Sequence, residues 1–336
     1  MFYRLMSNTM SSTINVTVHA SQFPQIVQEG LLEGLRTRCV PPKFHYQSYK
    51  QAELWLALHR AHSPVCLEPE CAAIYDRGFA VAAGLIPERG VRLTSLGCGG
   101  GEKEVRLLRL LAAAGKELSY HPCDVSLPLV LAAVCAAHNA CPTLTCEPLM
   151  CDLALADDLP QMLSQAGESG ARQIITCFGL LPNFEPANIL PKLAALVRPD
   201  DLLLLSANLA PGTDYRAGVQ RVFSGYDNAE TRAWLLAFLF DLGAEPGDGR
   251  VDFSIEEASG LFRIVADFRF LRDRVISVHG ERFPFCPGDA IRLFFSYRHT
   301  PERLRGLLQA HGLQVAEQWI STSEEEGVFL CRRTPR

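Results

Sequence analysis

The sequence predicts an α/β fold in which helices cover both faces of a mostly parallel sheet. Between residues 91 and 206, short apolar runs typical of buried strands alternate with segments whose apolar residues recur at helical spacing. Only short links separate these segments, which favours parallel strands joined by crossover helices. The first apolar run ends in a glycine-rich turn, where sheets of this type bind ligands. Together these observations predict a Rossmann-like domain.

Each element of this domain follows from a local signal. Strands are expected at residues 91–96, 118–123, 144–150, 173–178 and 202–206, which are short apolar runs. Helices are expected at residues 102–113, 127–137 and 187–197, where apolar side chains recur every three to four positions. Gly115 ends the first of these helices, and Ser126 is a candidate N-cap of the second.

The alternation breaks at Ala210-Pro211-Gly212. A helix at 231–242, a turn rich in Gly and Pro at 243–249 and strand-like segments at 261–270 and 274–279 follow. Helical and strand signals resume at 291–297. A helix is expected at 301–311 and strands at 314–320 and 327–332, and these two strands would close the sheet as an antiparallel pair. We therefore expect one domain of residues 64–209 and 291–336. A smaller α+β domain, inserted after the fifth strand, would comprise residues 1–63 and 210–290.

The composition excludes several classes of protein. The 336 residues are 48% apolar and 21% charged, which is typical of a soluble globular protein and rules out collagen-like and disordered chains. The net charge is −5, from 32 basic and 37 acidic residues, so no nucleic-acid partner is expected. No apolar run approaches the ~20 residues of a membrane-spanning helix, and the N-terminus lacks the apolar core of a secretory signal. We expect a soluble, cytoplasmic protein that has no membrane partner and acts on a small molecule.

Twelve cysteines are spread along the chain without the spacing of a zinc site. Four of them, Cys98, Cys123, Cys151 and Cys177, lie near the ends of predicted strands. Because a free cysteine behaves as a small buried apolar residue, we interpret these four as core residues and expect no metal site.

The turn Gly97-Cys98-Gly99-Gly100-Gly101 allows a ligand to approach the backbone closely. A dinucleotide-binding turn anchored on Gly97 would need a glycine at position 102, where the chain has Glu102. A carboxylate at a helix N-terminus opposes the binding of a pyrophosphate, which disfavours a nicotinamide-dependent dehydrogenase. S-adenosylmethionine carries a sulfonium cation and no phosphate, so it suits this turn better.

Acidic residues at the ends of the next two strands support the same ligand. Asp124 ends the second strand and can accept hydrogen bonds from both ribose hydroxyls of S-adenosylmethionine. Asp152 and Leu153 follow the third strand and can bind the adenine amino group and cover the ring. The carboxyl ends of parallel strands meet at one edge of a sheet, so these residues and the glycine turn predict an S-adenosylmethionine-dependent methyltransferase.

A family resemblance extends over roughly residues 35–335. The segments that carry it are Pro41-Pro42-Lys43-Phe44-His45-Tyr46, the glycine turn with Glu102-Lys103, Asp124-Val125-Ser126, Asp152-Leu153, Asn183-Phe184 and Tyr226-Asp227. In this order they resemble the L-histidine Nα-methyltransferases of the ergothioneine pathway and the related dimethylallyltryptophan N-methyltransferases. The resemblance implies a class I methyltransferase sheet with an inserted substrate domain.

The resemblance also implies roles for individual residues. The methyl donor would be bound by Tyr46, Gly97, Gly99, Gly101, Lys103, Asp124, Val125, Asp152 and Leu153. Asn183 and Tyr226 would hold the α-amino and carboxylate groups of the substrate. They would act in catalysis by positioning the amine, because an α-amino group with a pKa near 8 is partly neutral at pH 7 and needs no strong base.

The sequence departs from this family where the substrate side chain would bind. The histidine enzymes hold the imidazole with a Glu-x-Ser pair, and here these positions are Phe294 and Ser296. The family's upstream threonine corresponds to Leu180. An apolar pocket cannot compensate the desolvation of an imidazole nitrogen, so we expect an amino acid or derivative other than histidine, of aromatic or modified type. O- or S-methylation of a metabolite that is not an amino acid, and donor binding without turnover, are the alternatives.

Overall fold

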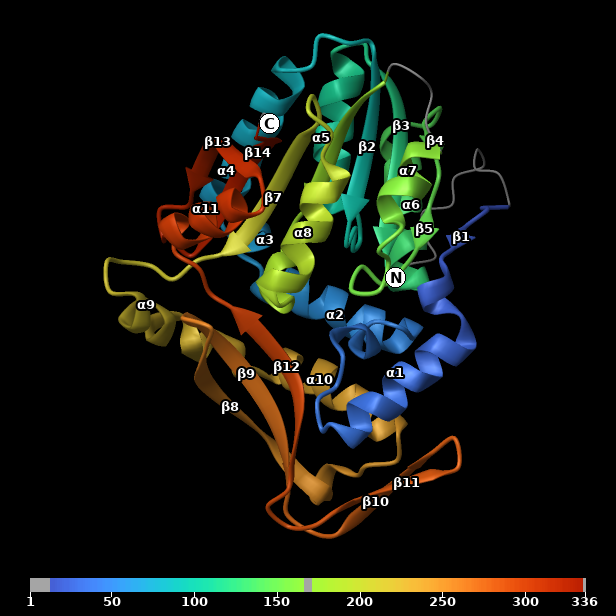
Figure 1. Cartoon of the computed structure of the whole chain (residues 1–336), viewed down its shortest axis with the longest axis vertical. Helices are drawn as coiled ribbons and strands as arrows, with labels where there is room; N and C mark the ends of the chain where they lie inside the picture. Colours follow the sequence, from blue (N-terminus) through green and yellow to red (C-terminus); the bar gives the residue numbers. More distant parts are fainter. Residues whose placement is uncertain (1–12, 166–170, 335–336) are drawn as a thin grey trace.

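A computed structural model describes residues 13–165 and 171–334 of the chain. Its largest sheet has the order β1-β5-β3-β2-β6-β7-β14-β13, with β4 beside β3 (Figure 1). The strands are β1 (Thr17–Val18), β2 (Gly90–Leu96), β3 (Glu117–Asp124), β4 (Thr145–Cys146), β5 (Leu149–Met150), β6 (Arg172–Cys177), β7 (Leu202–Asn208), β13 (Leu313–Ile320) and β14 (Glu326–Arg333). The strands from β1 to β7 pair in parallel, whereas β14 is antiparallel to both β7 and β13. The predicted α/β class and its closing antiparallel pair are confirmed.

Helices cover both faces of this sheet because its strands have apolar side chains on both faces. In β7, Leu203 and Leu205 belong to one apolar cluster, and the alternate residues Leu202 and Leu204 belong to another. The first cluster includes side chains of α7 (Leu159–Gln165), α8 (Pro186–Leu196) and α11 (Pro301–Ala310). The second includes side chains of α4 (Pro69–Gly84), α5 (Glu102–Ala113) and α6 (Leu127–Ala140). The predicted helix 102–113 and the predicted N-cap Ser126 are confirmed.

A second unit lies below this sheet in Figure 1. It contains α9 (Tyr215–Val222), α10 (Ala229–Asp241), a sheet of order β12-β9-β8 and the hairpin β10-β11. Its strands are β8 (Gly249–Ala258), β9 (Leu261–Phe270), β10 (Arg274–Val278), β11 (Glu281–Phe285) and β12 (Ala290–Tyr297). Side chains from α1 (Pro24–Arg36), η3 (Pro42–His45) and α2 (Tyr49–His62) complete its apolar core, and α3 (Pro64–Leu67) leads back to the large sheet.

The chain leaves the large sheet and returns to it at neighbouring points. Leu209 and His299 form an isolated parallel bridge. The Ala210 amide donates to the His299 carbonyl at 2.8 Å, and the His299 amide donates to the Asn208 carbonyl at 3.1 Å. The segment between them is therefore an insertion that begins and ends side by side.

Three details differ from the sequence-based expectation. Residues 291–297, expected in the domain of the large sheet, form β12 and pair with β9 of the inserted sheet. Residues 144–150, expected as one strand, form the two short strands β4 and β5, because Pro148 between them has no amide proton for the sheet. β1, in the segment expected with the inserted domain, pairs with β5 at the edge of the large sheet.

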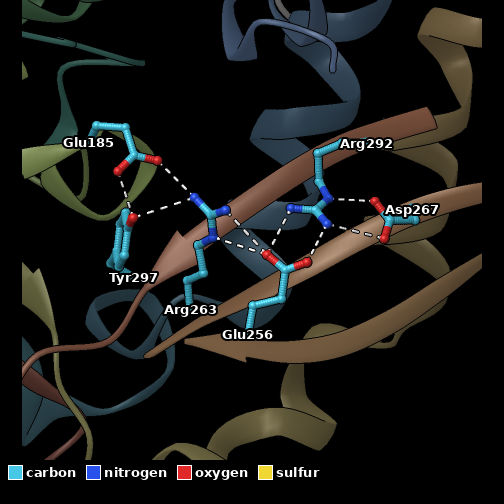
Figure 2. A network of polar contacts seen from close by, with 6 residues as sticks. All are labelled: Glu185, Glu256, Arg263, Asp267, Arg292 and Tyr297. Atoms are coloured by element: carbon cyan, nitrogen blue, oxygen red, sulfur yellow. Dashed lines mark hydrogen bonds and ion pairs between the residues drawn. The ribbon is translucent and has the colours of Figure 1, made fainter. Parts of the chain in front are cut away.

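A chain of ionic contacts connects the two units (Figure 2). Glu185, directly before α8, accepts hydrogen bonds from the Tyr297 hydroxyl at 2.6 Å and from Arg263 Nη1 at 2.7 Å. Arg263 also pairs with Glu256 of β8, which accepts from Arg292 Nη2 at 2.6 Å. Arg292 in turn pairs with Asp267. These contacts tie the start of α8 to all three strands of the inserted sheet.

Within the described ranges, no helix is long and apolar enough to cross a membrane. The four cysteines interpreted as core residues, Cys98, Cys123, Cys151 and Cys177, are buried as predicted.

Candidate functional site

A cleft of about 520 Å³ lies between the carboxyl ends of the large sheet's strands and the inserted unit. Most of the predicted site residues line it: Tyr46, Gly97, Gly99, Lys103, Asp124, Val125, Asp152, Leu153, Leu180, Asn183, Tyr226 and Phe294. Gly101 and Ser296 are not among its lining residues. Gly101 is the N-cap of α5, where a Cβ atom would come within 3.0 Å of the Ala133 backbone, so it serves helix packing. The fold thus gathers residues that lie up to 250 positions apart at roughly one place.

The glycine turn after β2 has a backbone that only glycine adopts easily. Gly97 has φ 65° and Gly99 has φ 51°, both in the left-handed region. A Cβ atom on Gly99 would lie 2.9 Å from the Trp55 ring, and one on Gly97 would lie 3.0 Å from the Leu180 side chain. The missing side chains leave room at the floor of the cleft, as the close approach of a ligand to the backbone requires.

Asp124 ends β3 and is buried beside this turn. Its Oδ2 accepts from the Gly99 amide at 3.1 Å and its Oδ1 from the Ser126 amide at 3.0 Å. Burial raises the pKa of Asp124 to about 6, although the backbone amides act in the opposite direction. The Val125 amide also contributes a backbone hydrogen bond, and the carboxylate lines the cleft, where its remaining lone pairs can accept from hydroxyl groups of a ligand.

Asp152 is held by a contact that the sequence did not predict. Its Oδ2 lies 3.1 Å from Nζ of Lys43, and both side chains are nearly buried. The other oxygen, Oδ1, accepts from the Ala154 amide at 2.9 Å. Lys43 belongs to the Pro-Pro-Lys segment before Tyr46, so this segment and the end of β5 are joined across one end of the cleft.

Aromatic rings form the wall of the cleft on the side of the inserted unit. The ring centroids of Tyr46 and Trp234 are 5.4 Å apart, those of Trp234 and Phe294 5.9 Å, and those of Phe294 and Tyr226 6.2 Å. Trp55 lies 5.9 Å from Tyr46 and continues this wall toward the glycine turn. Trp55 and Trp234 were not predicted, because an aromatic residue on a helix is indistinguishable from a core residue without the tertiary fold.

Asn183 lies in the short turn η4 (Leu181–Asn183) that follows β6. Its Nδ2 donates to the Phe295 carbonyl oxygen at 2.8 Å. Since that carbonyl can only accept, the amide orientation is fixed, and Oδ1 is left as an acceptor in the cleft. The side chain can therefore bind an N–H donor such as an amine.

Tyr226 forms a polar cluster with two residues of the β12 end. Its hydroxyl lies 3.0 Å from the Ser296 hydroxyl, and Arg298 Nε donates to it at 3.0 Å. Ser296 is fully buried behind Tyr226. It contacts the Tyr226 hydroxyl and is not among the residues that line the cleft, so the substrate contact implied by the family resemblance stays a prediction.

The profile of a protein family described as histidine-specific, S-adenosylmethionine-dependent methyltransferases matches residues 26–333. A search of curated proteins found no match.

Three solved structures have a partial similarity to this chain. The 1,6-didemethyltoxoflavin N1-methyltransferase of Burkholderia thailandensis is 13% identical, with 84% of this chain and 87% of that chain covered and a TM-score of 0.43. An amino pentose methyltransferase of Micromonospora echinaspora is 16% identical, with 83% and 96% covered and a TM-score of 0.34. A possible exported protein of Bordetella parapertussis is 13% identical, with 93% and 87% covered and a TM-score of 0.48. TM-scores this low assign no activity to the chain. The family match over residues 26–333 is the comparison that indicates a methyltransferase.

Proposed function

The chain belongs to the family of histidine-specific, S-adenosylmethionine-dependent methyltransferases, and we propose that it methylates the α-amino nitrogen of an amino acid or derivative other than histidine. Family membership makes it a methyltransferase with S-adenosylmethionine as methyl donor. The substrate is our proposal. The observation that carries it is the aromatic wall of Trp234, Phe294 and Tyr226, which lines the same cleft as an Asn183 amide oxygen suited to an amine.

The residues at the ends of β2, β3 and β5 fit the methyl donor. The glycine turn leaves space that a Cβ atom would fill, and the Asp124 carboxylate faces the cleft, where it can accept from the ribose hydroxyls. We assign the adenine end to Asp152 and Leu153, with Lys43 fixing the Asp152 carboxylate. When bound, S-adenosylmethionine supplies an electrophilic methyl group.

The chain itself mainly has to position the amine. Asn183 Oδ1 accepts one N–H of the neutral amine and so fixes the direction of its lone pair. The aromatic wall excludes water around the reacting groups. Holding two reactants in a productive orientation can lower the barrier by roughly 7–11 kcal/mol. No strong base is needed because an α-amino group with a pKa near 8 is partly neutral at pH 7. The proton released on methylation passes to solvent or buffer.

The wall also argues against histidine. A neutral imidazole has one N–H donor and one acceptor nitrogen, and Phe294 offers neither a partner nor a charge. Ser296 is buried against the Tyr226 hydroxyl, and its own hydroxyl does not replace the charge of the lost carboxylate. Burying the imidazole nitrogens without partners would cost a few kcal/mol, whereas an indole, phenyl or prenylated ring would bury apolar surface against the wall.

Turnover of a pooled substrate set tests this proposal. The protein is incubated with S-adenosylmethionine carrying a labelled methyl group and with amino acids and their aromatic or modified derivatives. We expect a labelled N-methyl product from an aromatic or modified amino acid and little product from histidine. Labelling of only a hydroxyl or thiol acceptor would support the alternative O- or S-methyltransferase. Donor binding without any labelled product would support a binding protein, and efficient histidine methylation would contradict the argument from the apolar wall.

A further inference from the structure

The cleft contains a buried guanidinium that has no carboxylate partner among the described residues. Arg298 directly follows β12, lines the cleft and is only 9% exposed. Its Nε donates to the Tyr226 hydroxyl at 3.0 Å, and its Nη1 donates to the carbonyl oxygens of Leu209 at 3.0 Å and Glu325 at 3.4 Å. All three acceptors are uncharged. Nη2 makes none of the hydrogen bonds found within the described ranges.

Other arginines of the inserted sheet are paired differently. Arg263 contacts the carboxylates of Glu185 and Glu256, and Arg292 contacts those of Glu256 and Asp267. Both lie in the ionic chain of Figure 2, outside the cleft lining. Arg298 is more buried than either and yet forms no ion pair with any carboxylate of residues 13–165 and 171–334, which is the costlier arrangement.

Glu326 is a nearby carboxyl group whose pKa is raised by burial and lowered by the charges of Lys103 and Arg298. It accepts a hydrogen bond from the Tyr75 hydroxyl at 2.5 Å and makes no ion pair with Arg298. Burial is the larger effect, so the pKa of Glu326 is raised, which favours its uncharged form. The charge of Arg298 is therefore available to an anion that enters the cleft.

We propose that Arg298 binds the carboxylate of the substrate and restricts the enzyme to amines that carry such a group. This inference rests on the proposed function and sharpens it, because it makes Arg298 a specificity-determining residue. Nη2 is a free donor of a planar guanidinium, which suits a carboxylate. Nε already donates to the Tyr226 oxygen, so the Tyr226 proton is free to point to Ser296 or to the same carboxylate.

The test compares an accepted amino acid with its decarboxylated amine. Both are assayed with the wild-type protein, Arg298→Met, Arg298→Lys and the control Arg303→Met, whose cation lies over the Tyr215 ring and outside the cleft lining. A hydrogen bond to a charged group is lost in Arg298→Met, so we expect kcat/KM for the amino acid to fall about 10- to 100-fold, mainly through KM. Activity on the amine should change less than about 2-fold, Arg298→Lys should retain part of the lost activity, and Arg303→Met should match the wild type.

Several outcomes would overturn the inference. Arg298 also donates hydrogen bonds to the carbonyl oxygens of Leu209 and Glu325. If its role were only structural, Arg298→Met would lower kcat/KM equally for the amino acid and for the amine. Donor affinity shows whether Arg298→Met is folded. If Arg298→Met is unfolded, the wild-type protein and Arg298→Lys still test the inference. Equal kcat/KM of the wild type for the amino acid and for the amine would exclude selection for the carboxylate.

Failure of this inference is distinguishable from failure of the proposed function. If amino acids are methylated but Arg298→Met discriminates as the wild type does, only the role of Arg298 is wrong. If the acceptor atom is an oxygen or sulfur, the proposed function is wrong, and Arg298 is still tested on that acceptor with and without a carboxylate. Absence of turnover on every acceptor would overturn both.

Discussion

In the proposed donor site, Asp124 is the residue whose charge we expect to affect donor binding most directly. Its pKa is raised to about 6 by burial, so a large part of it is protonated at pH 5 and little at pH 8. Only the ionised carboxylate can accept from the backbone amides and from ribose hydroxyls at the same time, because a protonated carboxyl group turns one of its oxygens into a donor. Donor affinity should therefore rise with pH through about 6. The same shift costs folding stability above that pH, because a carboxyl group whose pKa is raised on folding stabilises most when it is protonated.

Replacing Asp124 by Asn should weaken donor binding about 10- to 1,000-fold, since two hydrogen bonds to a charged group are at stake. The variant should also lose the rise in affinity between pH 5 and pH 7. Calorimetric titration with S-adenosylhomocysteine over this pH range measures both effects. An unchanged dissociation constant would remove Asp124 from the donor site.

Phe294 is the residue whose replacement we expect to change the selectivity for histidine. It lies between Trp234 and Tyr226, and Leu180 also lines the cleft. Phe294→Glu combined with Leu180→Thr should raise kcat/KM for histidine relative to the native substrate by about 10- to 100-fold, since each good polar contact contributes about 1–3 kcal/mol. Steady-state kinetics on both substrates measure the ratio.

A carboxylate among aromatic rings is costly if the cleft stays dry, so donor binding must first show that this variant is folded. A folded variant without any gain on histidine would mean that position 294 does not correspond to the glutamate of the histidine enzymes.

At the scale of elements, the glycine turn after β2 offers a matched pair of substitutions. Gly99 and Gly115 both have left-handed φ angles, 51° and 72°, but only Gly99 has a neighbour, Trp55, in the path of a Cβ atom. Gly99→Ala and Gly115→Ala should each cost about 1–2 kcal/mol of stability from the backbone angle. Only Gly99→Ala should also weaken donor binding, by 10-fold or more, because Trp55 must move. Denaturant unfolding and donor titration of both variants separate the two effects. Equal donor affinities would show that the turn tolerates a side chain.

Elements with a strong local pattern were predictable, and those defined by tertiary pairing were not. The apolar positions of α5 recur at helical spacing between a glycine turn and Gly115, and its bounds follow directly. β12 has a bulge between Arg292 and Phe294, which no local pattern signals. Their partners on β9, Asp267 and Ala266, are consecutive, so the bulge places Arg292 and Phe294 on opposite faces.

The candidate site shows the same division. Asp124 and Asp152 lie at the ends of predicted strands, so their position at the same edge of the sheet could be predicted from the sequence. Lys43, Trp55, Trp234 and Arg298 come from segments far away in the sequence, and their place in the cleft depends on how the inserted unit packs. A lysine or tryptophan on such a segment carries no local signal of function.

At the scale of the whole molecule, the cleft lies between the two units, so a ligand that fills it binds only the folded protein. S-adenosylmethionine and S-adenosylhomocysteine should raise the melting temperature, because a ligand at 100 times its Kd stabilises the native state by about 2.7 kcal/mol. NAD should have no effect, since Glu102 lines the cleft at the start of α5. Differential scanning calorimetry with each ligand, and with Asp124→Asn as control, checks this. Equal stabilisation by NAD would contradict the assignment of the donor.

The adjacent ends of the insertion, bridged at Leu209 and His299, have a consequence for how such enzymes diversify. Chain exit and re-entry occupy one spot on the large sheet, so an inserted segment of another length or sequence can be accommodated there without altering the strand order. Phe294, Tyr226 and Trp234 all lie within that insertion, whereas the glycine turn, Asp124 and Asp152 lie outside it. If the proposed roles are correct, the residues that recognise the acceptor can change through one inserted segment while the residues that bind the methyl donor stay the same.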